Sequence, residues 1–341
     1  MSVVARSRIF KAGVIAAVTV VLLGLGYLGM KQSSPTPATI VEKLAIAVSS
    51  SHHNGLPHIA AAMGFFTEQD LDVTLVPIPY GKAGIERVLE GKADLTFAAE
   101  VPFSVAVIKG EALSLVATML DISDSHGVIA RRDRGISSVA DLVGKKVGLK
   151  LGTSAEYFLW ALLVRHRIAP DSVILVDLPP GQLAQALAEG SIDAVAVWQP
   201  YVLDTQNAVG ENAVSFVDID VYTQSSVLVA RSDILKQRSV AIERLMRALL
   251  KAEQLSRSQP EESLKVVATW LKRDVEDLRP LWKALDFNIS LQQSHLITLE
   301  DEARWAMNSG YVAKGPIHNF LPNLYLDALL AVKPERVTVV R

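Results

Sequence analysis

The chain has 341 residues with 34 basic and 36 acidic side chains, and its formal net charge is −2. This balance provides no strongly basic face, so we expect no nucleic-acid partner. The absence of cysteine excludes disulfides, thiolate metal sites, cysteine nucleophiles and a lipid-anchored bacterial export signal.

The beginning of the chain predicts a membrane anchor or a signal peptide. Residues 1–11 are basic and residues 12–30 carry no charge; as a helix, this apolar stretch would span roughly 28 Å, close to the hydrocarbon thickness of a bilayer. Basic residues on its N-terminal side predict that residues 1–11 stay in the cytoplasm. The sequence at the end of this apolar stretch, LGYLGMKQSS, is a poor signal-peptidase cleavage site, which favours an uncleaved anchor over a cleaved signal peptide. We therefore expect a tether at residues 31–42 and a folded part in the periplasm or on the outer face of the cytoplasmic membrane.

From Lys43 onward, short strand patterns alternate with helical patterns. The first series predicts strands at residues 43–50, 71–79, 93–100, 113–120 and 126–133, with helices at 55–66, 83–91 and 101–111. The second predicts a short capped helix and a strand within 136–152, helices at 153–168, 181–190 and 200–210, and strands at 173–179, 192–198, 212–219 and 225–237. After Ser239 the apolar residues recur at helical spacing. This alternation predicts mostly parallel sheets with helices on both faces.

One phrase occurs twice, about a hundred residues apart: EGKADLTFAAEVP at residues 90–102 and EGSIDAVAVWQP at residues 189–200. In each, a glycine ends a helix, a short buried strand follows, and a proline opens another helix. The repeat predicts two α/β lobes of like construction. The strands GVIARRD and VLVARSD mark the crossings, which predicts lobe 1 at residues 43–130 and 227–341 and lobe 2 at residues 131–226. We expect the ligand in the cleft between the lobes, at the carboxyl ends of the strands.

Two long stretches carry a resemblance to a known family. GFFTEQDLDVTLVPIPYGKAGIERVLEGKADLTFAAEVP and DLVGKKVGLKLGTSAEYFLWALL, together with VILVDLPPGQLAQALAEGSIDAVAVWQPY, resemble the substrate-binding proteins of nitrate, sulfonate and taurine ABC transporters. The resemblance covers roughly Lys43 to Ala230. It implies a two-lobed periplasmic-binding-protein fold with a hinged cleft.

The same resemblance implies a function without catalysis. The chain would capture a small anionic or zwitterionic solute, such as a sulfonate, taurine or nitrate, and present it to an ABC permease and its ATPase. We expect a monomer that needs no cofactor. The stretches SSSHHNG and AAEVP depart from the glycine-rich or aromatic residues of many relatives, which leaves the identity of the solute open.

The candidate ligand-binding residues lie where strands end at the expected cleft. Hydroxyls and imidazoles beside a helix N-terminus suit an oxyanion, as at Ser50, Ser51, His52, His53, Thr153 and Ser154. An aromatic wall with polar neighbours is expected at Trp198 and Gln199. The other candidates are Tyr80, Gly81, Glu100, Asp124 and Ser125.

Glu100 needs a partner because a carboxylate that faces a closed cleft is costly when unpaired. A ligand amine could be that partner, and so could a hinge arginine such as Arg131 or Arg132. An amine would combine with the anion-binding loops to suit a zwitterion such as an aminosulfonate. Asp94 and Asp193 begin their strands instead of ending them, and we expect structural roles for both.

Other function classes have weaker support. His52, His53 and Glu100 could supply zinc ligands, but adjacent histidines often point apart, and we expect no metal site. No G-x-S-x-G, Walker A or G-x-G-x-x-G motif occurs, so hydrolase, NTPase and dinucleotide-enzyme functions lack support. A membrane-tethered sensory or scaffold module remains the alternative. An enzyme resembling those that make the thiamine pyrimidine is disfavoured because this chain has no cysteine.

Overall fold

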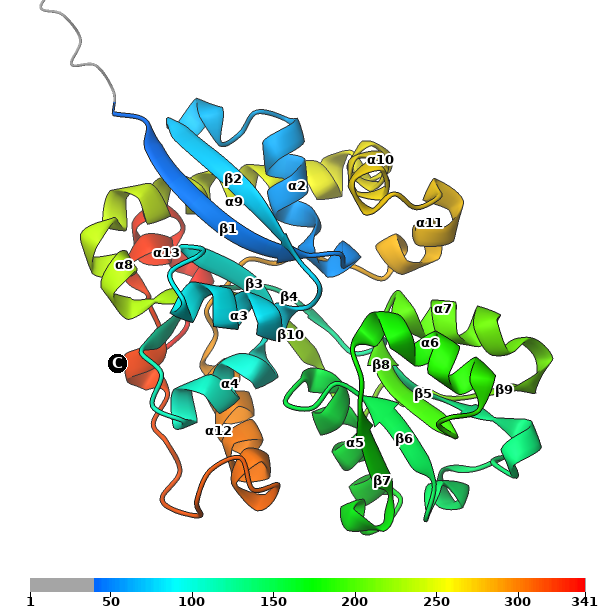
Figure 1. Ribbon diagram of the computed structural model, residues 1–341. Coiled ribbons are helices and arrows are strands. Elements are labelled where there is room, and N and C mark those ends of the chain that lie inside the picture. Colours follow the sequence, from blue (N-terminus) through cyan, green and yellow to red (C-terminus); the bar gives the residue numbers. More distant parts are fainter. Residues whose placement is uncertain (1–39, 341) are drawn as a thin grey trace, which may run out of the picture. The chain divides into compact units, whose positions relative to one another are not determined.

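The computed structural model describes residues 40–340 (Figure 1). The expected basic segment at 1–11, the expected anchor at 12–30 and residues 31–39 of the expected tether lie outside the described residues. Within the described range, none of the helices combines the length and the apolar character that a bilayer crossing requires.

The first sheet has the strand order β2-β1-β3-β10-β4. β1 pairs in parallel with β2 and β3, whereas β10 runs antiparallel to both of its neighbours. The strands are β1 (Glu42–Ser49), β2 (Leu71–Ile78), β3 (Leu95–Ala99), β4 (Leu113–Ile122) and β10 (Gln224–Arg231).

The second sheet repeats this plan with the order β7-β6-β8-β5-β9. β6 pairs in parallel with β7 and β8, and β5 runs antiparallel to both of its neighbours. The strands are β5 (His126–Arg131), β6 (Lys146–Leu149), β7 (Ile174–Asp177), β8 (Ala194–Trp198) and β9 (Ala213–Phe216). Both sheets are therefore mixed, with four strands running in one direction, and in each the reversed strand is the one that enters from the other lobe.

The crossings between the lobes lie earlier than the sequence predicts. β5 pairs only within the second sheet, so the first crossing is residues 123–125 and not the boundary expected after residue 130. The physical reason is that β5 is apolar on both faces: Val128 and Ile129 fill two different cores of the second lobe. The second crossing is residues 217–223, just before β10.

Helices cover both sheets, and the described chain after residue 231 adds six α-helices, joined by loops, and no strand to either sheet (Figure 1). Residues 232–237 form a helix, although the sequence predicts a strand there. The expected capped helix after Ser137 is a short 3₁₀ turn, Val139–Leu142, closed by a capping box between Ser138 and Asp141. The helices are α2 (Gly55–Ala62), α3 (Gly81–Leu89), α4 (Glu100–Ile108), α5 (Ser154–Arg165), α6 (Pro180–Glu189), α7 (Tyr201–Val209), α8 (Ser232–Gln237), α9 (Ser239–Ser258), α10 (Pro260–Leu271), α11 (Val275–Lys283), α12 (Gln293–Asn308) and α13 (Asp327–Val332).

The repeated phrase has the same structural role in both sheets. The Asp94 carboxylate accepts a hydrogen bond from the backbone N–H of Ala45 in β1, with 2.7 Å between the two atoms. The Asp193 carboxylate accepts one from the backbone N–H of Lys146 in β6 at 2.9 Å. Each aspartate thus fixes the neighbouring parallel strand of its own sheet, which confirms the structural roles expected for both.

Two helices contribute to the cores of both lobes. On α4, Phe103 lies in the first core and Val105 in the second. On α12, Leu299 lies in the first core and Trp305 in the second. These helices pack against each other and bring the two cores into contact behind the strand ends.

Candidate functional site

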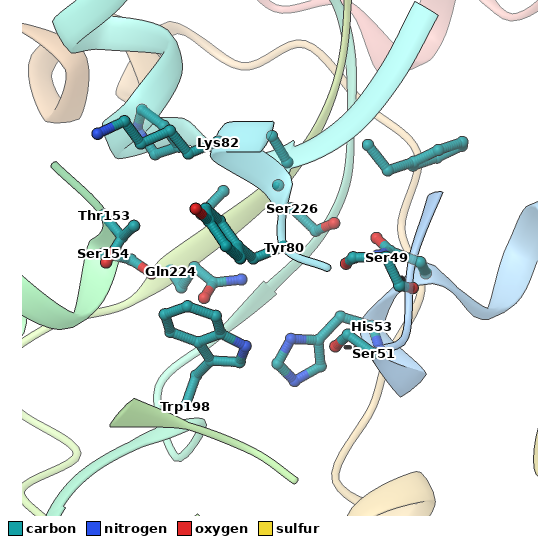
Figure 2. A pocket seen from close by; sticks show the side chains of 16 residues that line it. Ser49, Ser51, His53, Tyr80, Lys82, Thr153, Ser154, Trp198, Gln224 and Ser226 are labelled. Atoms are coloured by element: carbon teal, nitrogen blue, oxygen red, sulfur yellow. Dashed lines mark hydrogen bonds between the residues drawn. The ribbon is translucent and has the colours of Figure 1, made fainter. Parts of the chain in front are cut away.

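A cavity of about 50 Å³ lies where carboxyl ends of strands from both sheets meet. By the volume that a buried water needs, it holds about four water-sized atoms, which is the scale of a nitrate ion or a sulfonate head group. Its lining residues are Ser49, Ser51, His53, Asn54, Tyr80, Gly81, Lys82, Phe97, Ala98, Ala99, Pro102, Thr153, Ser154, Trp198, Gln224 and Ser226. Figure 2 shows Thr153 and Ser154 on one side and Ser49 and Ser51 on the other, with the rings of Trp198, His53 and Tyr80 between them.

The structure brings together about half of the predicted site residues. Ser51, His53, Tyr80, Gly81, Thr153, Ser154 and Trp198 line the cavity. Ser50 and Asp124 are exposed, and His52 is buried beside the His53 ring without lining the cavity. Gln199 does not line the cavity, and its side-chain oxygen accepts a hydrogen bond from the backbone N–H of Leu203 at 3.4 Å.

Several lining residues were not among the predicted ones. Asn54 belongs to the loop already selected, and its side-chain amide donates to the hydroxyl of Ser49 at 2.9 Å. Gln224 and Ser226 lie on β10, after the second crossing. Their i, i+2 spacing places both side chains on one face of the strand. This spacing of two polar residues is the sequence pattern from which they could have been predicted.

Gly81 allows α3 to begin directly against β3. A Cβ atom at this position would lie 2.7 Å from the Cα of Ala98, which is too close for any side chain. The close approach brings the start of α3, with Tyr80 and Lys82, to the cavity.

A hydrogen-bonded chain of Ser125, His126 and Ser154 supports one side of the cavity. The Ser125 hydroxyl lies 2.7 Å from His126 Nδ1, and His126 Nε2 lies 3.0 Å from the Ser154 hydroxyl. Burial lowers the pKa of His126 to about 3, with a further contribution from His53. The imidazole is therefore neutral at physiological pH and orients the Ser154 hydroxyl. Ser125 acts on the site through His126 and does not line the cavity itself.

His53 brings a second neutral imidazole to the site. Burial lowers its pKa to about 4, and its Nε2 atom has no hydrogen-bond partner among residues 40–340. An unpaired buried ring nitrogen is costly, so a polar atom of a ligand would relieve it.

Lys82 is the one cationic side chain in the lining. Its ammonium group donates to the carbonyl oxygen of Leu151 at 3.0 Å, and burial lowers its pKa. Leu151 belongs to the loop before α5, so this hydrogen bond reaches from the first lobe to the second. No aspartate or glutamate lines the cavity.

Glu100 lies behind the cavity wall and does not line it. Glu100 is 2% exposed, and its carboxylate accepts hydrogen bonds from the hydroxyl of Tyr222 at 2.6 Å and from the backbone N–H of Ser225 at 3.0 Å. The expected partner Arg131 binds Asp133 instead, at 2.6 Å. The expected hinge arginine is thus replaced by a tyrosine and a backbone amide, while contact of Glu100 with a ligand amine stays a prediction. No cluster of metal-ligating side chains occurs in the described part of the chain.

Comparison with known proteins agrees with this architecture. A family model described as NMT1/THI5 like matches residues 51–263. A binding protein of Brucella abortus (strain 2308) is 27% identical over 223 residues, which cover 64% of this chain and 68% of that protein. An aliphatic sulfonates-binding protein of Bacillus subtilis (strain 168) is 26% identical over 218 residues, covering 62% of this chain and 63% of that protein.

A solved structure shares the fold over nearly its whole length. The periplasmic aliphatic sulphonate binding protein of Escherichia coli aligns with a TM-score of 0.71 at 19% identity, covering 84% of this chain and 98% of that chain. This confirms the two-lobed fold that the sequence predicts. All three of these proteins are named as binding proteins and not as enzymes.

Proposed function

The chain belongs to the NMT1/THI5-like family, and we propose that it is the solute-binding receptor of an ABC importer. Its lobes would close on a small anionic solute and present it to a permease and its ATPase. Hinge closure around a ligand is a known mode of action of such receptors. The observation that carries the proposal is the cavity at the strand ends of both sheets.

The lining of the cavity favours an anionic head group. The polar side chains there are hydroxyls, amides, neutral imidazole and indole groups and one ammonium group, that of Lys82. Donors held in fixed positions stabilise negative charge on an oxyanion. A sulfonate, such as those named for two of the compared proteins, has a head group of suitable size and charge.

A zwitterion has less support than a plain anion. The amine of taurine would need an acceptor, and the expected acceptor, Glu100, is occupied by Tyr222 and Ser225. We therefore propose that an alkanesulfonate without an amine binds at least as tightly as taurine.

The proposed location is the periplasm, with residues 12–30 as an anchor to the cytoplasmic membrane. Tethering would raise the local concentration of the receptor near its permease. Extraction of membranes from cells that express the full-length chain tests this: an anchored protein needs detergent for release, whereas a cleaved one appears in the periplasmic fraction.

Thermal unfolding of the full-length protein in mild detergent tests the solute class. The panel is methanesulfonate, ethanesulfonate, taurine and nitrate, with dimethyl sulfone as the uncharged match of methanesulfonate. A ligand at a hundred times its Kd raises the free energy of unfolding by about 2.7 kcal/mol. We expect saturable stabilisation by a sulfonate and none by dimethyl sulfone. Equal stabilisation by both compounds, or by none of the panel, would contradict the anion proposal.

A further inference from the structure

Two buried glutamates lie against each other behind the cavity wall. Glu100 begins α4 and Glu302 lies on α12, the helix packed against it. The two residues are 2% and 0% exposed. Neither carboxyl group forms an ion pair with a cationic side chain in residues 40–340.

The two carboxyl groups differ in their hydrogen bonds. Glu100 accepts from Tyr222 and from the backbone of Ser225, so an ionised Glu100 is stabilised. The oxygens of Glu302 form no well-aligned hydrogen bond within the described residues, and the polar groups beside them are Glu100 and the Ser104 hydroxyl. An ionised Glu302 would therefore be buried, poorly paired and next to a second negative charge.

Two adjacent carboxylates in an apolar setting cannot both ionise readily, and such pairs share a proton. Burial raises the pKa of Glu100, whereas its hydrogen bonds from Tyr222 and Ser225 act in the opposite direction. Burial, together with the charge of Glu100, raises the pKa of Glu302 well above its usual range. The arrangement favours a protonated Glu302 beside an ionised Glu100.

The pair lies where the ligand cavity and both lobes meet. Tyr222 belongs to the second crossing, and its ring lies 5.2 Å from the rings of Tyr157 and His126, both in the second lobe. Ser225 lies between the cavity-lining residues Gln224 and Ser226. The hydrogen bonds of Glu100 therefore join the first lobe to the second crossing and to the cavity wall.

Other titratable groups surround the pair without neutralising it. Asp301 precedes Glu302 on α12, and Tyr157 faces the pair from α5. His295 of α12 shares a small cavity with Glu100, but its Nε2 atom lies 3.5 Å from Asp121 of β4. Asp301 adds negative charge, which makes loss of the shared proton still less favourable.

We propose that the Glu100–Glu302 pair is a proton-binding site that couples solute capture to proton uptake. The coupling rests on the proposed function, whereas the shared proton does not. Loss of that proton places two negative charges side by side at the junction of the lobes and disfavours the arrangement in which Glu100 holds Tyr222 and Ser225. A solute that selects this arrangement therefore binds more weakly as the pH rises through the pKa of the pair.

The shared proton is tested first without ligand. At pH 6 ordinary glutamates are ionised, so a protonated carboxyl band in the infrared spectrum marks a carboxyl group that keeps its proton. We expect the full-length protein to show such a band. We expect Glu302→Gln to lose this band and Glu262→Gln, at an exposed glutamate, to retain it. Identical bands in wild type and Glu302→Gln would overturn the proposal.

Calorimetric titration with methanesulfonate between pH 6 and pH 8 tests the coupling, because the charge of this anion does not change over that range. Uptake of one proton on binding makes Kd rise by up to about tenfold per pH unit above the pKa of the pair. We expect this slope in wild type and in Glu262→Gln, and a nearly constant Kd in Glu302→Gln. Glu100→Gln provides a second test of the slope if Glu302→Gln does not fold.

The outcomes separate the two proposals. A constant Kd in wild type, or an unchanged slope in Glu302→Gln, would overturn the coupling. A carboxyl band without any binding of methanesulfonate or the other anions would support the shared proton and contradict the proposed solute class.

Discussion

The ammonium nitrogen of Lys82 lies 3.0 Å from the carbonyl oxygen of Leu151, so a hydrogen bond joins the start of α3 to the loop before α5. Both ends of this contact lie beside the cavity, where Lys82 is the one positive charge in the lining. Lys82 can therefore contribute twice to solute capture, through its charge and through the contact between the lobes.

Replacing Lys82 by methionine should weaken anion binding while retaining most of the apolar stem. A charge-assisted hydrogen bond contributes about 1.5–3 kcal/mol, which corresponds to an increase in Kd of roughly 13- to 160-fold. Calorimetry with methanesulfonate measures the change. Lys92→Met is the matched control, because Lys92 is exposed and pairs with Glu90. Equal affinities in the two variants would exclude Lys82 from the site.

Ser154→Ala should lower affinity by a smaller factor. Loss of a neutral hydrogen bond costs about 0.5–1.5 kcal/mol, or roughly 2- to 13-fold in Kd. The comparison variant is Ser125→Ala, which breaks the bond to His126 Nδ1 but leaves the Ser154 hydroxyl at the cavity. We expect Ser154→Ala to bind the anion more weakly than Ser125→Ala does; the reverse order would mean that the Ser154 hydroxyl does not contact the ligand.

His58→Phe should reduce the loss of stability in acid. Burial lowers the pKa of His58 to about 3, while an unfolded histidine binds its proton below about pH 6.5. Between these values the unfolded state holds the extra proton, so the free energy of unfolding falls as the pH falls, by up to about 1.4 kcal/mol per pH unit. Phenylalanine can keep the stacking on Trp270, whose ring centroid lies 3.3 Å away, and cannot take up a proton.

Urea unfolding at several pH values from 4.5 to 7 measures this difference. The control is His166→Phe, since His166 is exposed and should leave the slope of wild type nearly unchanged. Parallel stability curves for wild type and His58→Phe would show that His58 does not titrate as its burial implies.

Asp193→Ala should destabilise the protein by about 1–2 kcal/mol, because a backbone N–H of β6 loses its charged acceptor. Asp193→Asn retains a side-chain oxygen and should recover part of the loss. Neither variant should change the affinity for an anion, because Asp193 does not line the cavity. Chemical denaturation followed by titration checks both points, and a large loss of affinity in the folded asparagine variant would contradict the purely structural role.

The repeated phrase explains why much of the fold could be predicted. A glycine stop, an aspartate and a buried strand are local features, and the roles of Asp94 and Asp193 follow from their place at the strand start. The lobe boundary was harder to predict, because β5 is apolar on both faces and such a strand is compatible with either sheet. Its pairing with β8 and β9 is a property of the tertiary structure.

The site residues divide in the same way. Ser51, Tyr80 and Thr153 follow strand ends and could be selected from order along the chain. Gln224 was not predicted because it lies at the start of a strand and the candidates were taken from strand ends. Its strand, β10, is reversed, so its first residue lies at the same edge of the sheet as the last residues of the other strands. Glu100 was predicted from its place shortly before a proline. The orientation of its side chain, however, depends on a hydrogen bond from Tyr222, which is 122 residues away.

The sharing of α12 between the two cores has a consequence for how the protein unfolds. Leu299 and Trp305 lie six positions apart on one helix, yet each packs in a different lobe. Loss of α12 would expose apolar surface in both lobes at once, so neither sheet keeps a complete core without it. We therefore expect residues 40–340 to melt in a single cooperative transition in spite of their two separate sheets.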